Sequence, residues 1–334
     1  MENRQLGASG IAVSALGLGC LSFSGYYGSG GRVPADDARK LIDRALGLGV
    51  NFFDTAAMYV GSEELLGSAL KGRREKRTIA TKFGVILDTG GRPAGMDARP
   101  EAVVKACDES LLRLGIDVID LFYLHRIDRA VPIEDTVGAL ADLIHAGKIK
   151  GIGLCEVSSV TLRRAHGTHP IAAVQSEYSL WSREVEDKIL PTCRELGIAF
   201  VPYSPLGRGF LSGEVKAVDD LPTTDIRRAI PRFQAENFAR NQALMRDLAA
   251  MAARYEATPA QVALAWLLRQ GDDIVPIPGT KHIKYLEENA CAVNVRISPD
   301  DVATLSRTFA PDRIAGERHG EASGRFVDTE PGVS

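Results

Sequence analysis

Short runs of apolar residues alternate along the chain with longer segments in which apolar residues recur at helical spacing. Eight such runs occur, at residues 15–18, 51–54, 78–82, 118–124, 150–154, 172–175, 198–203 and 274–277. Each run is short and almost wholly apolar, which is typical of a parallel strand that is buried on both faces. The pattern therefore predicts eight buried parallel strands.

The segments between these runs predict helices with recognisable ends. They span residues 34–47, 99–114, 133–146 and 184–196, and a further helix begins near Ser62. A glycine follows several of them, as expected where a helix ends in a left-handed residue. Strand–helix units repeated about eight times are typical of an α/β fold of the (β/α)8, or TIM, barrel class.

Three segments stand outside this repeat. Residues 4–13 predict a β-hairpin that would close the bottom of the barrel. Residues 207–240 form a long loop after the seventh predicted strand, and loops of this length are usually functional or mobile. Residues 317–334 are rich in Gly, Glu and Ser and predict a flexible C-terminal tail, which leaves residues 1–316 as a single barrel domain.

A doubly wound parallel sheet is the structural alternative. That fold would carry a GxGxxG turn after the first strand, with an acidic residue about 20 positions further on. The chain has GLGC at residues 17–20 instead. The barrel is therefore favoured.

Composition narrows the classes of partner. The 334 residues carry a net charge of −3, which gives no basic field to attract nucleic acid or anionic lipid. Five cysteines, an odd number without a CxxC pair, indicate reduced thiols rather than a disulfide framework or a metal site. No apolar signal core or stretch of ~18 apolar residues is present. We expect a cytoplasmic protein that acts on a small molecule, and the sequence leaves the oligomeric state open.

Four polar residues lie at or just after the ends of three consecutive predicted strands: Asp54 and Tyr59, then Lys82, then His125. Because the carboxyl ends of barrel strands share one rim, we expect these side chains to lie together. A lysine cation held by an aspartate favours the phenolate and lowers the pKa of a neighbouring tyrosine. Such a tyrosine is a workable general acid for a carbonyl oxygen.

Each of the four also has a purely structural interpretation. Asp54 could cap a helix, Tyr59 could be an aromatic residue at the rim, Lys82 could end a strand in solvent, and His125 could be a core histidine. Their joint position on adjacent strand ends favours the chemical interpretation.

Longer motifs carry a family resemblance. They are GVNFFDTAAMYVGSEELLGSAL, ATKFG, DLFYLHRID, GKIKGIGLCEVS, VQSEYSLWSRE, VPYSPLGRGFLSG and IPGTKHIKYLEEN. Together they resemble the aldo-keto reductase superfamily, and most of all its branch of auxin-induced-like and pyridoxal- or perakine-reductase-like enzymes. The resemblance implies an oxidoreductase in which Tyr59 is the general acid, Lys82 and Asp54 tune it, and His125 orients the substrate carbonyl.

The resemblance also implies NADPH, with NADH possible, bound extended across the barrel rim. The Gln175 amide could form hydrogen bonds with the nicotinamide carboxamide, and the Tyr203 ring could stack on the face of the nicotinamide ring. Arg208 and its loop suit the pyrophosphate, and Lys281 suits a 2′-phosphate. The full expected cofactor set is Gly19, Cys155, Glu156, Gln175, Tyr203, Ser204, Pro205, Leu206, Gly207, Arg208, Gly279, Thr280, Lys281, Tyr285, Glu288 and Asn289. Tyr26, Tyr27 and Trp181 are candidates for the substrate pocket.

The chain departs from the family pattern at three cofactor positions. Cys155 stands where the family usually has serine, and a thiol is a poor hydrogen-bonding partner. His282 and Tyr285 stand where many relatives have arginine. Lys281 would then supply most of the positive charge that binds a 2′-phosphate.

Two other functions remain as alternatives at this level. A Schiff-base aldolase would use Lys82 as its nucleophile, although pairing with Asp54 would keep the ammonium charged. A cofactor-sensing regulatory subunit, in the manner of potassium-channel β-subunits, would bind NADPH and turn over slowly.

Overall fold

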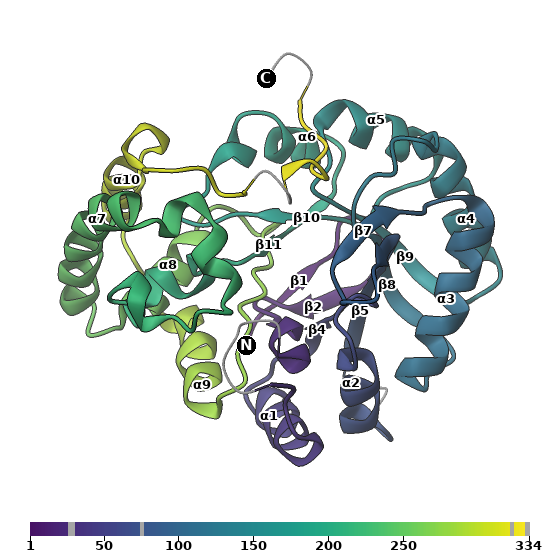
Figure 1. Ribbon diagram of the computed structural model, residues 1–334, viewed down its shortest axis with the longest axis horizontal. Coiled ribbons are helices and arrows are strands. Elements are labelled where there is room, and N and C mark those ends of the chain that lie inside the picture. Colours follow the sequence, from purple (N-terminus) through teal and green to yellow (C-terminus); the bar gives the residue numbers. More distant parts are fainter. Residues whose placement is uncertain (26–30, 74–76, 321–323, 331–334) are drawn as a thin grey trace.

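A parallel sheet curves into a barrel with helices packed around its outside (Figure 1). The computed structural model describes residues 1–25, 31–73, 77–320 and 324–330. Seven strands follow one another around the sheet in chain order. They are β3 (Leu18–Gly19), β4 (Phe52–Asp54), β5 (Thr78–Phe83), β8 (Ile119–Leu124), β9 (Ile149–Cys155), β10 (Ala173–Glu177) and β11 (Ala199–Tyr203).

The ring is closed by residues 274–279, which lie between β11 and β3. Parallel bridges join Phe200 to Ile274 and Gly19 to Gly279. Pro276 and Pro278 have no N–H to donate, so this segment pairs through isolated bridges rather than a continuous strand. The predicted eighth strand is thus in its expected place, and the predicted barrel class is confirmed.

Ten helices of the described residues cover the barrel (Figure 1). They are α1 (Ala35–Gly47), α2 (Ser62–Leu70), α3 (Pro100–Leu114), α4 (Ile133–His145), α5 (Ser159–Thr168), α6 (Ile189–Glu195), α7 (Ala235–Arg254), α8 (Pro259–Leu268), α9 (Ile283–Cys291) and α10 (Pro299–Thr308). Helix α3 ends where Gly115 adopts φ 62°, as its sequence predicts. The predicted helix at 184–196 is wrong in its first half. That half forms a 3-10 turn at Glu184–Glu186, and Pro191, which cannot donate an N–H, lies in the first turn of α6.

Apolar side chains fill the barrel and plug its bottom. Strands β1 (Asn3–Gln5) and β2 (Ala12–Ser14) form the expected antiparallel hairpin. Leu6 and Val13 of this hairpin are fully buried and pack with the apolar side chains of the barrel interior. A Cβ on Gly7 would lie 2.6 Å from the Gly197 oxygen, so the hairpin sits directly against the turn before β11.

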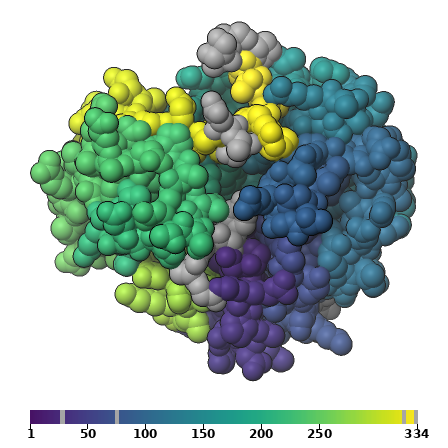
Figure 2. All heavy atoms as spheres, in the orientation of Figure 1, coloured from purple at the N-terminus to yellow at the C-terminus, as the bar shows by residue number. Residues whose placement is uncertain are grey.

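Three segments rise above the opposite rim. The hairpin of β6 (Val85–Leu87) and β7 (Pro93–Met96) follows β5, and the sequence did not predict it. The long loop after β11 forms 3-10 turns at Gly207–Ser212, Val218–Asp220, Ile226–Ala229 and Pro231–Phe233. The C-terminal segment, residues 315–320 and 324–330, lies between these two regions in the space-filling view (Figure 2, yellow). No helix in the described ranges is long and apolar enough to cross a membrane.

Candidate active site

An ion pair between neighbouring strands lies at the centre of the rim. Asp54 ends β4, and Lys82 lies one residue before the end of β5. The Lys82 Nζ donates to Asp54 Oδ1 and, at 2.7 Å, to the Thr55 oxygen. Gln175 Nε2 donates to Asp54 Oδ2 at 2.8 Å. Burial opposes the charged ammonium, but the Asp54 carboxylate outweighs it and raises the pKa of Lys82.

Two aromatic rings lie beside this pair. The Tyr59 ring comes from the loop after β4, and its centroid is 5.3 Å from Lys82 Nζ. His125 follows β8, and its ring meets that of Tyr59 edge-on, with centroids 5.9 Å apart and planes at 85°. The fold thus brings together all four residues that the sequence placed on three strand ends.

Burial shifts the pKa values of both rings. We expected a lowered pKa for Tyr59, but burial raises it to about 12 and outweighs the lowering by Lys82. Tyr59 is therefore protonated at neutral pH and can act as a proton donor. Burial, with Arg126 and Lys82 nearby, moves the pKa of His125 well below its usual range, so its imidazole is neutral.

A cavity of about 990 Å³ opens at this rim. Tyr59, His125 and Asp54 line it on one side. Most of the expected cofactor residues line the remainder: Gly19, Gln175, Tyr203, Ser204, Pro205, Leu206, Arg208, Gly279, Thr280, Lys281, Tyr285, Glu288 and Asn289. The cavity is large enough to hold one end of a dinucleotide cofactor together with a small substrate.

The other candidates lie elsewhere. Cys155 belongs to the buried barrel interior, and the carboxylate of Glu156 is bound to Arg318. Trp181 is only 3% exposed, and its ring stacks on Phe210 with centroids 3.9 Å apart. Gly207 lies under Trp181, where a Cβ would be 2.7 Å from the indole. None of Cys155, Glu156, Trp181 or Gly207 is part of the cavity wall, and Tyr26 and Tyr27 lie outside the described residues.

Comparison with known proteins identifies the family. A profile described as "Aldo/keto reductase family" matches residues 15–308. The chain belongs to the aldo/keto reductase family. It is 45% identical over 334 residues to "Probable aldo-keto reductase 1" of Glycine max, covering 98% of this chain and 95% of that protein. Members of this family are oxidoreductases that act on small carbonyl substrates and generally use NAD(P)H.

A solved structure of another family member shares the fold. The glycerol dehydrogenase from Gluconobacter oxydans superposes with a TM-score of 0.83 at 27% identity, covering 92% of this chain and 96% of that one. The barrel of this aldo/keto reductase is therefore the one found in its family.

The cavity wall fits a nicotinamide dinucleotide. Tyr203 Oη is buried and has no hydrogen-bond partner in the described chain, so its ring lines the cavity with an unused polar atom. Gly19 and Gly279 form a bare backbone floor, where a Cβ on Gly279 would lie 2.9 Å from the Gly19 oxygen. Ser204 and Arg208 have positive φ values of 47° and 57° in the turn after β11. Such strained turns present successive backbone N–H groups and are typical of anion-binding loops.

The sequence missed several cavity residues. Val85, Pro93 and Met96 come from the β6–β7 hairpin, whose short and partly exposed strands give no clear pattern. Arg126 directly follows His125 and also lies at the rim. Its position next to a predicted site residue is a signal in the sequence that could have identified it. Residues of the C-terminal segment also line the cavity: His319, Gly320, Arg325 and Phe326.

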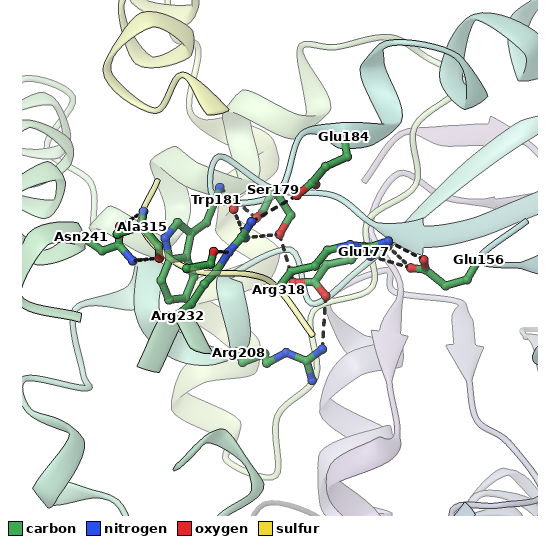
Figure 3. A network of polar contacts seen from close by, with 12 residues as sticks. Glu156, Glu177, Ser179, Trp181, Glu184, Arg208, Arg232, Asn241, Ala315 and Arg318 are labelled. Atoms are coloured by element: carbon green, nitrogen blue, oxygen red, sulfur yellow. Dashed lines mark hydrogen bonds and ion pairs between the residues drawn. The ribbon is translucent and has the colours of Figure 1, made fainter. Parts of the chain in front are cut away.

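A polar network holds the C-terminal segment against the rim (Figure 3). Arg232 donates to the Gly316 oxygen at 3.0 Å and to Ser182 Oγ at 2.7 Å. The Asn241 side chain exchanges two hydrogen bonds with the Ala315 backbone, at 2.9 and 2.8 Å. The long loop after β11 and helix α7 therefore anchor the point at which the chain turns back over the cavity.

Proposed function

We propose that this protein reduces an aldehyde or ketone to an alcohol with NADPH, and that Tyr59 is the general acid. The observation that carries the proposal is the position of a protonated Tyr59 over the Lys82–Asp54 pair, beside a neutral His125, at the wall of the cavity. A proton donor and a neutral hydrogen-bonding group side by side are what a carbonyl oxygen requires as it becomes an alkoxide.

Several groups of the chain would hold the cofactor. NADPH, when bound, supplies the hydride. Tyr203 would pack on the nicotinamide ring and Gln175 would bind its carboxamide. The turn that contains Ser204 and Arg208 would bind the pyrophosphate, and Lys281, just before α9, would bind a 2′-phosphate.

The proton transfer follows from the electrostatics of the four residues. Tyr59 Oη gives its proton to the substrate oxygen, which leaves a phenolate. The Lys82 ammonium, kept charged by Asp54, stabilises that phenolate. The neutral His125 ring donates a hydrogen bond to the same substrate oxygen and so fixes its position.

Removal of one hydroxyl group tests the proposal. In Tyr59→Phe, we expect kcat for NADPH oxidation with an aromatic aldehyde to fall by about 10²–10⁴-fold, the usual contribution of a general acid. The dissociation constant for NADPH, measured by fluorescence titration, should change by less than about threefold. Tyr255→Phe, which removes a hydroxyl bound to Asp301 far from the cavity, is the matched control. Near-normal turnover by Tyr59→Phe would show that another group supplies the proton.

The same preparation separates the two alternatives. A Schiff-base aldolase would be trapped covalently by borohydride in the presence of a carbonyl substrate, but the charged state of Lys82 disfavours that chemistry. A regulatory subunit would bind NADPH tightly and fail to turn over a broad panel of aldehydes.

A further inference from the structure

The cavity contains a positive side chain that neither the proton transfer nor the cofactor contacts use. Arg126 follows His125 directly and lines the cavity. Its Nη1 donates to the His125 oxygen at 2.6 Å. Across the described ranges, its guanidinium forms no ion pair with a carboxylate. Arg126 is half-buried, and a guanidinium with little access to water is normally paired with an anion, because an isolated charge there is costly.

Arg126 keeps its charge in this position. Burial acts to lower its pKa, but Tyr203, Glu156, Cys155 and Tyr59 outweigh burial, and the pKa lies above its usual value. Two of these neighbours, Tyr59 and Tyr203, line the cavity. The positive charge therefore lies beside the place where the substrate carbonyl meets Tyr59.

The nearby carboxylates are already committed to other partners. Glu156 accepts two hydrogen bonds from Arg318, at 3.0 and 2.7 Å, and a third from the Glu177 N–H at 3.0 Å (Figure 3). Asp54 is paired with Lys82 and also accepts from Gln175. Neither acid forms a hydrogen bond with Arg126, and the charge of Glu156 acts on it only from a distance, so within the described residues this side of the cavity holds a cation without a directly bound anion.

Two further arginines add to the charge at the cavity mouth. Arg92 of the loop between β6 and β7 and Arg325 of the C-terminal segment both line the cavity and are exposed. Arg325 lies over the Phe326 ring, 4.5 Å from its centroid. Their charges would attract an anionic ligand towards the deeper Arg126.

We propose that Arg126 binds an anionic group of the substrate, so that the preferred substrates are aldehydes or ketones that carry a carboxylate or phosphate. This inference rests on the proposed reductase function. The planar guanidinium fork suits two parallel hydrogen bonds to either anion, and it completes the ion pair that the fold leaves open. Because Arg126 adjoins His125, the bound anion would set how far the carbonyl reaches towards Tyr59.

The first test compares matched substrates with the unaltered enzyme. We expect kcat/KM for 4-carboxybenzaldehyde to exceed that for its neutral methyl ester by at least about tenfold, the usual strength of hydrogen bonds to a charged group. D-glyceraldehyde 3-phosphate against D-glyceraldehyde tests phosphate in the same way. A preference in only one arm identifies which anion the site takes. Equal or lower values for both anions overturn the inference.

A variant then assigns the preference to Arg126. In Arg126→Gln, kcat/KM for the preferred anion should fall by about 10–100-fold, mainly through KM, while the neutral partner changes by less than about threefold. The affinity for NADPH should be unaffected. Arg313→Gln, at an exposed arginine outside the cavity, is the control. An equal loss on both substrates overturns the assignment to Arg126.

Different results would overturn the role of Arg126 and the reductase function. Turnover of the neutral ester without any preference for anions overturns only the role of Arg126. Absence of turnover with every carbonyl compound, charged or neutral, by an enzyme that binds NADPH overturns the reductase function and this inference with it.

Discussion

Arg318 and Glu156 are joined by two hydrogen bonds, of 3.0 and 2.7 Å, between residues that lie 162 positions apart in the chain. Both side chains are largely buried, with Glu156 just after β9 and Arg318 in the C-terminal segment. A second contact fixes the same segment nearby: the Ser158 N–H donates a hydrogen bond to Asp328 at 2.9 Å. Between these contacts, the segment contributes His319 and Phe326 to the cavity wall.

Loss of the Arg318–Glu156 pair should loosen the C-terminal segment. In Arg318→Met, we expect faster hydrogen exchange at the backbone amides of residues 316–320 and 324–328, because the bidentate ion pair no longer fastens them. Exchange in β8 should be unchanged. Arg313→Met, at an exposed arginine just before the segment, is the control. Unchanged exchange in Arg318→Met would mean that the other contacts suffice. The flexibility expected from the sequence stays a prediction that the same experiment measures.

The pair should also affect stability in acid. Burial alone would raise the pKa of Glu156, but Arg318 outweighs it and holds that pKa well below its usual range. A depressed folded pKa gives stability that is present above the unfolded value of about 4.3 and is lost as the pH falls below it. Glu156→Gln should cost roughly 3–5 kcal/mol at pH 7, because Arg318 is left unpaired. The difference from the unaltered protein, measured by urea unfolding, should shrink as the pH falls below about 4. A constant difference would contradict the role of the charge.

Lys281 should decide the preference between the two nicotinamide cofactors. It lies at the cavity wall just before α9. In Lys281→Met, we expect KM for NADPH to rise by about tenfold, a typical effect of one lost charge-assisted contact, and KM for NADH to change by less than about twofold. Lys284→Met, at the second residue of α9 and outside the cavity wall, is the matched control. Equal changes for both cofactors would place the 2′-phosphate elsewhere.

Two helical glycines should respond oppositely to the same substitution. A Cβ on Gly67 in α2 would lie 2.1 Å from the Leu114 oxygen, whereas one on Gly138 in α4 would meet nothing within 4 Å. Gly67→Ala should destabilise the protein by about 1–3 kcal/mol through overpacking. Gly138→Ala should stabilise it by about 0.5–1 kcal/mol through helix propensity. Urea unfolding of both variants measures the contrast, and a stable Gly67→Ala would mean that α2 and α3 can separate without cost.

The sequence predicts the barrel and the four central residues because both depend on local patterns. Buried parallel strands appear in the sequence as runs of apolar residues. Asp54, Lys82 and His125 lie at the ends of three of these strands. Strand ends converge in any barrel, so the positions of these residues in the chain determine their positions in space.

The sequence could not predict contacts between distant parts of the chain. Glu156 was expected at the cofactor, but its charge is taken by Arg318, which no local pattern connects to it. Trp181 was expected in the substrate pocket, but Phe210 covers its ring from the loop after β11. The pKa of Tyr59 was expected to fall with Lys82 nearby, but the burial that raises it depends on packing by many segments at once.

The floor of the cavity exists only where Gly19 meets Gly279. In a chain made from its N-terminus, Asp54, Tyr59, Lys82 and His125 are all synthesised long before Gly279 emerges. A nascent or truncated chain can thus hold every acid and base of the site and still have no cavity. Because such a long-range contact is slow to form, we expect activity to return during refolding only once Gly19 and Gly279 have met.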